Sequence, residues 1–118
     1  IMRVWGDGSP IRDFIYARDV ARGMIFAVEN KITEPLNLGC GKGVTIAQIA
    51  SSIAARFECG IEFDKSKPNG DPIRLLDMER MFSNGFKLSV DIDEGVEETI
   101  EWYLSNKDNL DYRYNSFK

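Results

Sequence analysis

Near its start, the chain carries an aromatic ring and a guanidinium group at the two ends of a glycine-rich turn. The segment reads Trp5-Gly6-Asp7-Gly8-Ser9-Pro10-Ile11-Arg12, and its two glycines and one proline predict a tight turn that leads into a strand. Trp5 offers a flat apolar surface, and Arg12 offers a planar fork that is always charged. A ring that can stack and a fork that can bind phosphate together indicate a nucleotide ligand.

Few residues of the chain suit other kinds of site chemistry. There is no histidine, so the commonest general acid/base and the commonest metal ligand are both missing. No cluster of cysteine, aspartate and glutamate has the spacing of a metal site, and we expect no metal. Tyr103 and Lys107 have a Tyr-x-x-x-Lys spacing that supports proton transfer in some enzymes. They fall at the end of an amphipathic helical pattern, and we interpret the spacing as a coincidence.

Composition limits the class of protein and its partners. The 118 residues suit one domain, and 43% are hydrophobic, which allows a core of ordinary size. A formal charge of −4 argues against a protein built to bind nucleic acid. No apolar run is long enough to span a membrane. Cys40 and Cys59 are too few for a disulfide framework, so we expect free thiols in a reducing compartment, the cytoplasm.

The hydrophobic pattern predicts a mixed α/β chain with short strands and about four helices. Strands are expected at 12–16, 36–38 and 61–63, and helices at 19–30, 45–57, 77–82 and 91–106. Thr45 with Gln48, and Asp91 with Glu94, form capping-box patterns at two helix starts. The helix that begins at Thr45 is expected to bury Ile46, Ile49, Ile53 and Phe57.

The expected strands are too few and too short for a complete doubly wound sheet. We therefore expect residues 1–107 to form a small α+β lobe that leans on a larger domain, with a polar tail over 108–118.

The glycines at 39, 41 and 43 allow a second interpretation. A glycine-rich loop after a strand, with Glu62 or Asp64 further along to hold a ribose, is typical of S-adenosylmethionine-dependent methyltransferases. Against this interpretation, the rest of the chain has one further expected strand, where that fold needs several. The spacing also lacks the third glycine position of a dinucleotide fingerprint. The alternative structural interpretation is a turn that joins a strand to a capped helix.

Several short motifs also follow one another in a fixed order along the chain. They are Trp-Gly-Asp-Gly-x-Pro-x-Arg-Asp-Phe (5–14), Asp-Val-Ala (19–21), Asn-x-Gly-x-Gly (37–41), Thr-Ile-x-x-Ile-Ala (45–50), Phe-Asp-x-Ser-Lys-Pro-Asn-Gly (63–70), Arg-x-Leu-Asp (74–77) and Glu-Gly-x-x-x-Thr-x-x-Trp-Tyr (94–103). This ordered set resembles the extended short-chain dehydrogenases/reductases, the NAD-dependent epimerase/dehydratase family that acts on nucleotide sugars. The Ser-Lys-Pro-Asn-Gly element and the tryptophan before Gly-Asp-Gly are similar to the GDP-L-fucose synthase subgroup.

The resemblance implies roles for individual residues. Arg12 and Lys67 match basic residues at the nucleotide diphosphate, and Trp5 matches an aromatic residue at the nucleotide end of the site. Asn69 and Asp71 are weaker candidates for contacts with ribose or sugar hydroxyls. Arg74 and Asp77 are interpreted as a structural ion pair and a helix cap.

The resemblance also implies a division of labour within a longer enzyme. An upstream Rossmann domain would hold NADP or NAD and a Ser/Thr-Tyr-Lys catalytic set, and none of those positions falls in this chain. We therefore expect the C-terminal substrate-binding lobe of a homodimeric epimerase/reductase, with a GDP-sugar as the favoured ligand. By itself this lobe is expected to have no catalytic residue, no bound cofactor and no catalysis. A stand-alone binding module without catalysis is the alternative.

Overall fold

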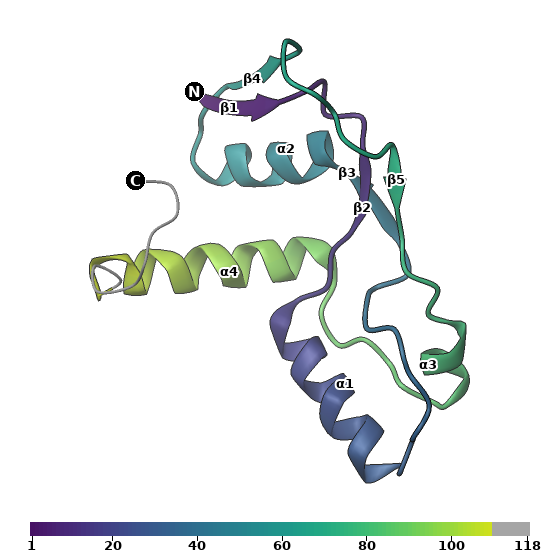
Figure 1. The fold of residues 1–118 in the computed structure, drawn as a ribbon. Helices are drawn as coiled ribbons and strands as arrows, with labels where there is room; N and C mark the ends of the chain where they lie inside the picture. The colour runs from purple at the N-terminus through teal and green to yellow at the C-terminus, as the bar shows by residue number, and fades with distance from the viewer. Residues whose placement is uncertain (110–118) are drawn as a thin grey trace.

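The computed structural model describes residues 1–109, where two small sheets and four α-helices form (Figure 1). The expected mixed α+β class with short strands and four helices is confirmed. Most of the polar tail predicted at 108–118 lies outside the described residues, and Lys107–Asn109 form a 3-10 helix. None of the described helices combines the length and the apolar character needed to cross a membrane.

The two sheets are joined by the glycine-rich turn. β1 (Met2–Trp5) pairs in parallel with β4 (Ile61–Asp64), so that Trp5 lies opposite Asp64. β2 (Ile11–Asp13) is the centre of the second sheet, between antiparallel β3 (Gly43–Thr45) and parallel β5 (Ile73–Arg74). The predicted strand at 61–63 is confirmed, and the one at 12–16 is shorter and begins one residue earlier. β3 and β5 were not expected from the sequence.

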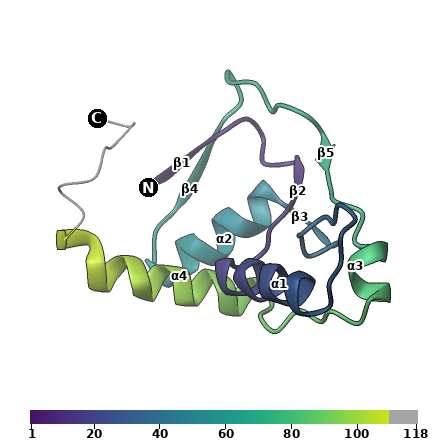
Figure 2. The same ribbon diagram turned by 60° about the horizontal axis from the view of Figure 1, so that its bottom comes forward.

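The four helices agree closely with the predicted ranges. They are α1 (Ala17–Glu29), α2 (Ile46–Arg56), α3 (Glu79–Ser83) and α4 (Ile92–Asn106). Thr45 caps α2 in a full capping box with Gln48, and Asp91 caps α4 by accepting a hydrogen bond from the Glu94 amide. β1 and β4 lie at one end of the molecule and α1 and α3 at the other, with α2 and α4 between (Figures 1 and 2).

The main apolar core lies at the end that holds α1 and α3. Met78, Met81 and Phe86 are buried there, and Leu36 and Leu38 pack against them. The expected burial along α2 is wrong in detail. Its fully buried side chains are Ala50 and Ala54, whereas Ile46, Ile49 and Ile53 are half-buried and Phe57 is 46% exposed. Ile49 and Ile53 are not fully buried because they line an apolar groove between α2 and α4, together with Val96 and Ile100 among others.

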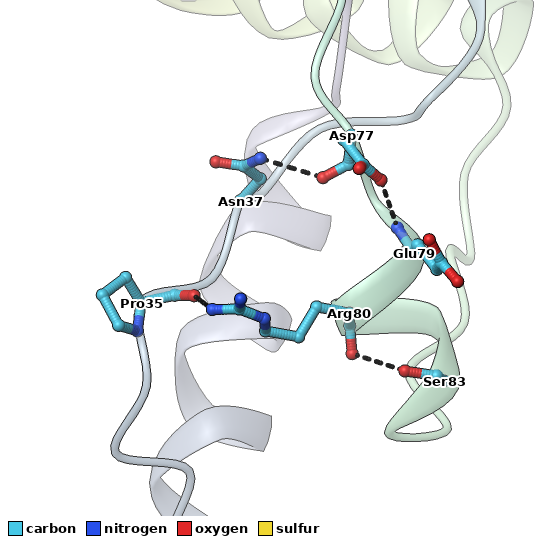
Figure 3. A pocket seen from close by; sticks show the side chains of 6 residues that line it. All are labelled: Pro35, Asn37, Asp77, Glu79, Arg80 and Ser83. Atoms are coloured by element: carbon cyan, nitrogen blue, oxygen red, sulfur yellow. Dashed lines mark hydrogen bonds between the residues drawn. The ribbon is translucent and has the colours of Figure 1, made fainter.

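The strand predicted at 36–38 does not form, although its two leucines are packed as expected. Hydrogen bonds to the α3 region hold this segment instead: the Asn37 side-chain amide donates to the Asp77 carbonyl at 2.9 Å, and Arg80 Nη1 donates to the Pro35 carbonyl at 2.8 Å (Figure 3). The alternation Leu-Asn-Leu therefore reflects contact with the core, not pairing with another strand.

One predicted ion pair is also wrong. Arg74 pairs with Asp71, not with Asp77. The Asp77 carboxylate accepts a hydrogen bond from the Glu79 amide at 2.9 Å, so its predicted capping contact does form, although the residue at the N-cap position is Met78.

Candidate functional site

The glycine-rich turn after β1 is closed by the side chain of Asp7. Asp7 Oδ1 accepts hydrogen bonds from the Ser9 amide at 2.9 Å and the Ser9 hydroxyl at 2.6 Å. These bonds, led by the one from the hydroxyl, lower the pKa of Asp7 from 3.8 to about 2. The carboxylate is therefore ionised, and the turn closed, throughout the neutral pH range.

This turn lies beside the loop that follows β4. The Asp64 carbonyl accepts from the Gly6 amide at 2.9 Å and from the Lys67 amide at 3.1 Å. Further along, the Ile11 amide donates to the Pro72 carbonyl at 2.9 Å. We call these two segments, residues 5–12 and 64–72, the clamp. Residues 65–72 form a loop, and backbone hydrogen bonds tie it to the turn.

All five site residues predicted from the sequence lie in the clamp. Trp5 is 70% exposed, and the Lys67 ammonium lies 5.7 Å from the centroid of its ring. This distance is within the range of a cation–π contact. Among the described residues, no carboxylate forms an ion pair with Lys67. The clamp therefore presents a largely exposed aromatic ring with a cation over it.

Arg12 is held by carbonyl oxygens. Its Nη1 donates to the carbonyls of Ile11 and Asp71, both at 2.8 Å. Within residues 1–109 it forms no ion pair, either with the nearby Asp7 and Asp13 or with another carboxylate. Carbonyls fix the side chain without neutralising its charge, and the fork can still donate to a phosphate.

Asn69 and Asp71 use their side chains within the protein. Asn69 Oδ1 accepts from the Asp7 amide at 2.8 Å, and the Asp71 carboxylate pairs with Arg74. Their contacts with ribose or sugar hydroxyls stay predictions. In this structure both residues hold the clamp together, Asn69 through its amide and Asp71 through the carbonyl that Arg12 contacts.

No role was predicted for Asp13, which organises the neighbouring glycine loop. Its carboxylate accepts from the amides of Cys40 at 2.7 Å, Gly41 at 3.1 Å and Leu76 at 3.3 Å. The alternation of side chains along a strand could have indicated this role. Consecutive residues of β2 face opposite sides of the sheet, so Arg12 and Asp13 contact different loops.

This use of Asp13 weakens the methyltransferase interpretation. The amides of Cys40 and Gly41, which would approach a ligand, already donate to the Asp13 carboxylate. The strand required before the loop, at 36–38, does not form. The loop is accounted for as structure.

Other candidate chemistry is sparse in the part of the chain that the structure describes. No three histidine, cysteine, aspartate or glutamate side chains there are grouped so that they could hold a metal ion. Cys40 and Cys59 are both free and half-buried. Tyr103 is half-exposed and lies near the C-terminal end of α4.

Comparison with known proteins gives consistent matches in sequence. Residues 2–39 match the NAD dependent epimerase/dehydratase family. Over 106 residues the chain is 37% identical to a probable GDP-L-fucose synthase 1 from Oryza sativa subsp. japonica. The aligned region covers 87% of this chain and 32% of the rice protein.

Solved structures give the same result for the fold. A GDP-L-fucose synthetase from Naegleria fowleri bound to NADP superposes with a TM-score of 0.80 at 25% identity, covering 90% of this chain and 35% of that protein. A UDP-N-acetylglucosamine 4-epimerase from Methanobrevibacter ruminantium M1, in complex with UDP-N-acetylmuramic acid, superposes with a TM-score of 0.78 at 28% identity, covering 89% and 35%. The chain spans about a third of the length of the relatives it matches.

Proposed function

We propose, because the chain belongs to the NAD dependent epimerase/dehydratase family, that it supplies the nucleotide-sugar-binding lobe of an NAD(P)-dependent epimerase/reductase. The observation that carries this proposal is the clamp, which brings Trp5, Lys67 and Arg12 to one edge of the molecule. The relatives named as GDP-L-fucose synthases support a GDP-sugar as the ligand. We extend the proposal to a GDP-sugar of the 4-keto-6-deoxy-mannose kind on the resemblance of the sequence motifs alone.

In this proposal the chain binds and orients the substrate. Trp5 stacks on the base, while Arg12 and Lys67 bind the diphosphate through charge-assisted hydrogen bonds. These contacts hold the sugar at a fixed place relative to the catalytic domain. Fixing the orientation of the substrate in this way raises the rate of the reaction.

Cofactor chemistry is assigned to the rest of the full-length enzyme. The glycine loop of this chain has neither the spacing nor the free amides of a dinucleotide site. By the same resemblance, the full-length enzyme is a cytoplasmic homodimer that uses NADP or NAD.

GDP binding to the chain tests the proposal. In an NMR titration with GDP, we expect the indole N–H of Trp5 to shift, while that of Trp102, on α4, serves as an internal control. Affinity is expected in the millimolar range, about −4 kcal/mol, because the other wall of the site is not present.

Two lysines of one loop provide matched variants. Lys67→Gln should weaken GDP binding about tenfold, since it removes a charged contact to phosphate. Lys65→Gln removes the same charge two residues away and should leave the affinity within about twofold. Equal effects of the two variants, or no shift of Trp5 in the unmodified chain, would contradict the proposed site.

The lobe should also be inactive by itself. We expect no oxidation of NADPH or NADH when the purified chain is given a GDP-4-keto-6-deoxy sugar. Turnover above a no-protein control would show that the division of labour proposed above is wrong.

A further inference from the structure

The side chain of Asn69 crosses from the loop of the clamp to the turn. Its Oδ1 accepts a hydrogen bond from the Asp7 amide at 2.8 Å. A backbone N–H can only donate, so the facing atom must be the amide oxygen. Three contacts follow one another along the two segments of the clamp. The Trp5–Lys67 pair comes first, the Asn69 bond second, and the contact of Arg12 with the Asp71 carbonyl third.

Gly6 provides the space that this contact needs. Its φ is +83°, and a Cβ at this position would lie 2.2 Å from Asn69 Oδ1. The glycine is therefore required both by the backbone conformation and by the close approach of Asn69. Since the Asp7 carboxylate already binds Ser9, Asp7 is fixed through its side chain and its backbone together.

We propose that Asn69 is a positioning residue that holds Trp5 at a fixed separation from Lys67 and Arg12, so that a nucleoside diphosphate is bound by its base and its diphosphate at once. This inference rests on the proposed function. Two-point binding gains affinity when the two subsites are already at the right distance. Without the Asn69 bond each subsite still binds its own part of the ligand, but the joint advantage falls.

Hydrogen exchange tests the bond itself, without any ligand. Asn69→Ala should abolish the protection of the Asp7 amide, whereas Asn69→Asp, which keeps an oxygen acceptor, should retain it. Asn84→Ala is the control, because the Asn84 amide bonds locally to the Arg80 carbonyl in α3. Unchanged protection of the Asp7 amide in Asn69→Ala would overturn the inference.

Ligand fragments test positioning against a general loss of structure. In NMR titrations, Asn69→Ala should weaken GDP binding about fivefold, the size expected for one hydrogen bond. Guanosine, followed at the Trp5 indole, and inorganic pyrophosphate, followed at Arg12 and Lys67, should each change less than about twofold. Equal weakening of all three ligands, or unchanged GDP binding, would overturn the positioning role.

The outcomes also separate this inference from the function on which it rests. If GDP does not shift Trp5 in the unmodified chain, the proposed function fails. If GDP shifts Trp5 equally in the unmodified chain and in Asn69→Ala, the nucleotide site stands and only the role of Asn69 is overturned.

Discussion

At the scale of single residues, Asp19 is the most constrained charge in the described chain. It is fully buried on α1 and accepts from the Ser89 amide at 2.9 Å, the Ser89 hydroxyl at 2.7 Å and the Val90 amide at 3.0 Å. Arg22, one helical turn away, completes the set with an ion pair. The carboxylate thus ties α1 to the segment that leads into α4.

Removing this charge should be costly. We expect Asp19→Asn to lower the free energy of unfolding by about 3 kcal/mol. It breaks the buried ion pair with Arg22, and it replaces one acceptor oxygen by an NH2 donor that faces other donors. Glu34→Gln makes the same kind of change at an exposed loop position and should cost less than about 0.5 kcal/mol. Urea unfolding of both variants measures the difference, and equal costs would contradict the assigned role.

Asp19 also predicts how stability depends on pH. Burial by itself raises the pKa of this carboxyl, but hydrogen bonds from Ser89 and Arg22 outweigh it, so the pKa falls below the usual 3.8. Its contribution to stability is therefore complete above pH 3.8 and is lost as the pH falls through the lower folded pKa. Unfolding at a series of acidic pH values should show a shallower loss for Asp19→Asn than for the unmodified chain. Parallel curves would exclude Asp19 as the source.

The sequence could indicate which residues suit a nucleotide, but not how each is held. Residue type alone made Trp5 and Arg12 candidates, and the resemblance added Lys67. The Asp71–Arg74 pair is local, at a spacing of three residues. Nothing local shows that Asn69 accepts from the Asp7 amide or that the Asp71 carbonyl accepts from Arg12, because these partners lie about 60 residues away. The role of Asp13 was hidden for the same reason, since the amides it binds are far away in sequence.

At the scale of elements, α2 is anchored to the clamp by its first turn. The Ile46 amide donates to the Pro10 carbonyl and the Ala47 amide to the Gly8 carbonyl, both at 2.9 Å. The next amide, that of Gln48, is capped by the Thr45 hydroxyl at 3.1 Å. The helix start therefore supports the glycine-rich turn that carries Trp5 and Arg12.

Loss of the cap should destabilise this junction. Thr45→Ala is expected to lower the free energy of unfolding by about 1 kcal/mol, the usual value for an N-cap. Thr33→Ala, in the exposed loop after α1, removes the same hydroxyl without a cap and should be nearly neutral. Chemical denaturation followed by circular dichroism gives both values, and a neutral Thr45→Ala would show that backbone contacts alone hold the helix start.

The helices were predictable and the strands only partly so, because their signals act over different distances. A cap such as Thr45–Gln48 lies within four residues, so the sequence contains the whole interaction. β3 and β5 form because each pairs with β2, and that pairing joins residues at least 30 positions apart. Leu36 and Leu38 have a strand-like alternation but pack on Met78 and Phe86 without a pairing partner.

At the scale of the whole molecule, the described fold is open. Its radius of gyration is 16.7 Å, whereas a compact domain of this length has roughly 13–14 Å. In this open shape, α1 packs one side against the core. Another side of the helix exposes an apolar stripe of Met24, Ile25 and Val28. Apolar patches of this kind promote association between molecules.

We therefore expect the isolated chain to self-associate weakly through the stripe on α1. Sedimentation velocity should show a coefficient that rises with protein concentration, and the rise should disappear in Ile25→Glu/Val28→Glu. Ser51→Glu/Ser105→Glu adds the same charge at exposed polar positions on α2 and α4 and should still associate. Loss of association in both double variants would assign the effect to net charge, and a concentration-independent coefficient in the unmodified chain would contradict the prediction. The helical circular dichroism of both variants should match that of the unmodified chain, because neither pair of side chains is buried in the core.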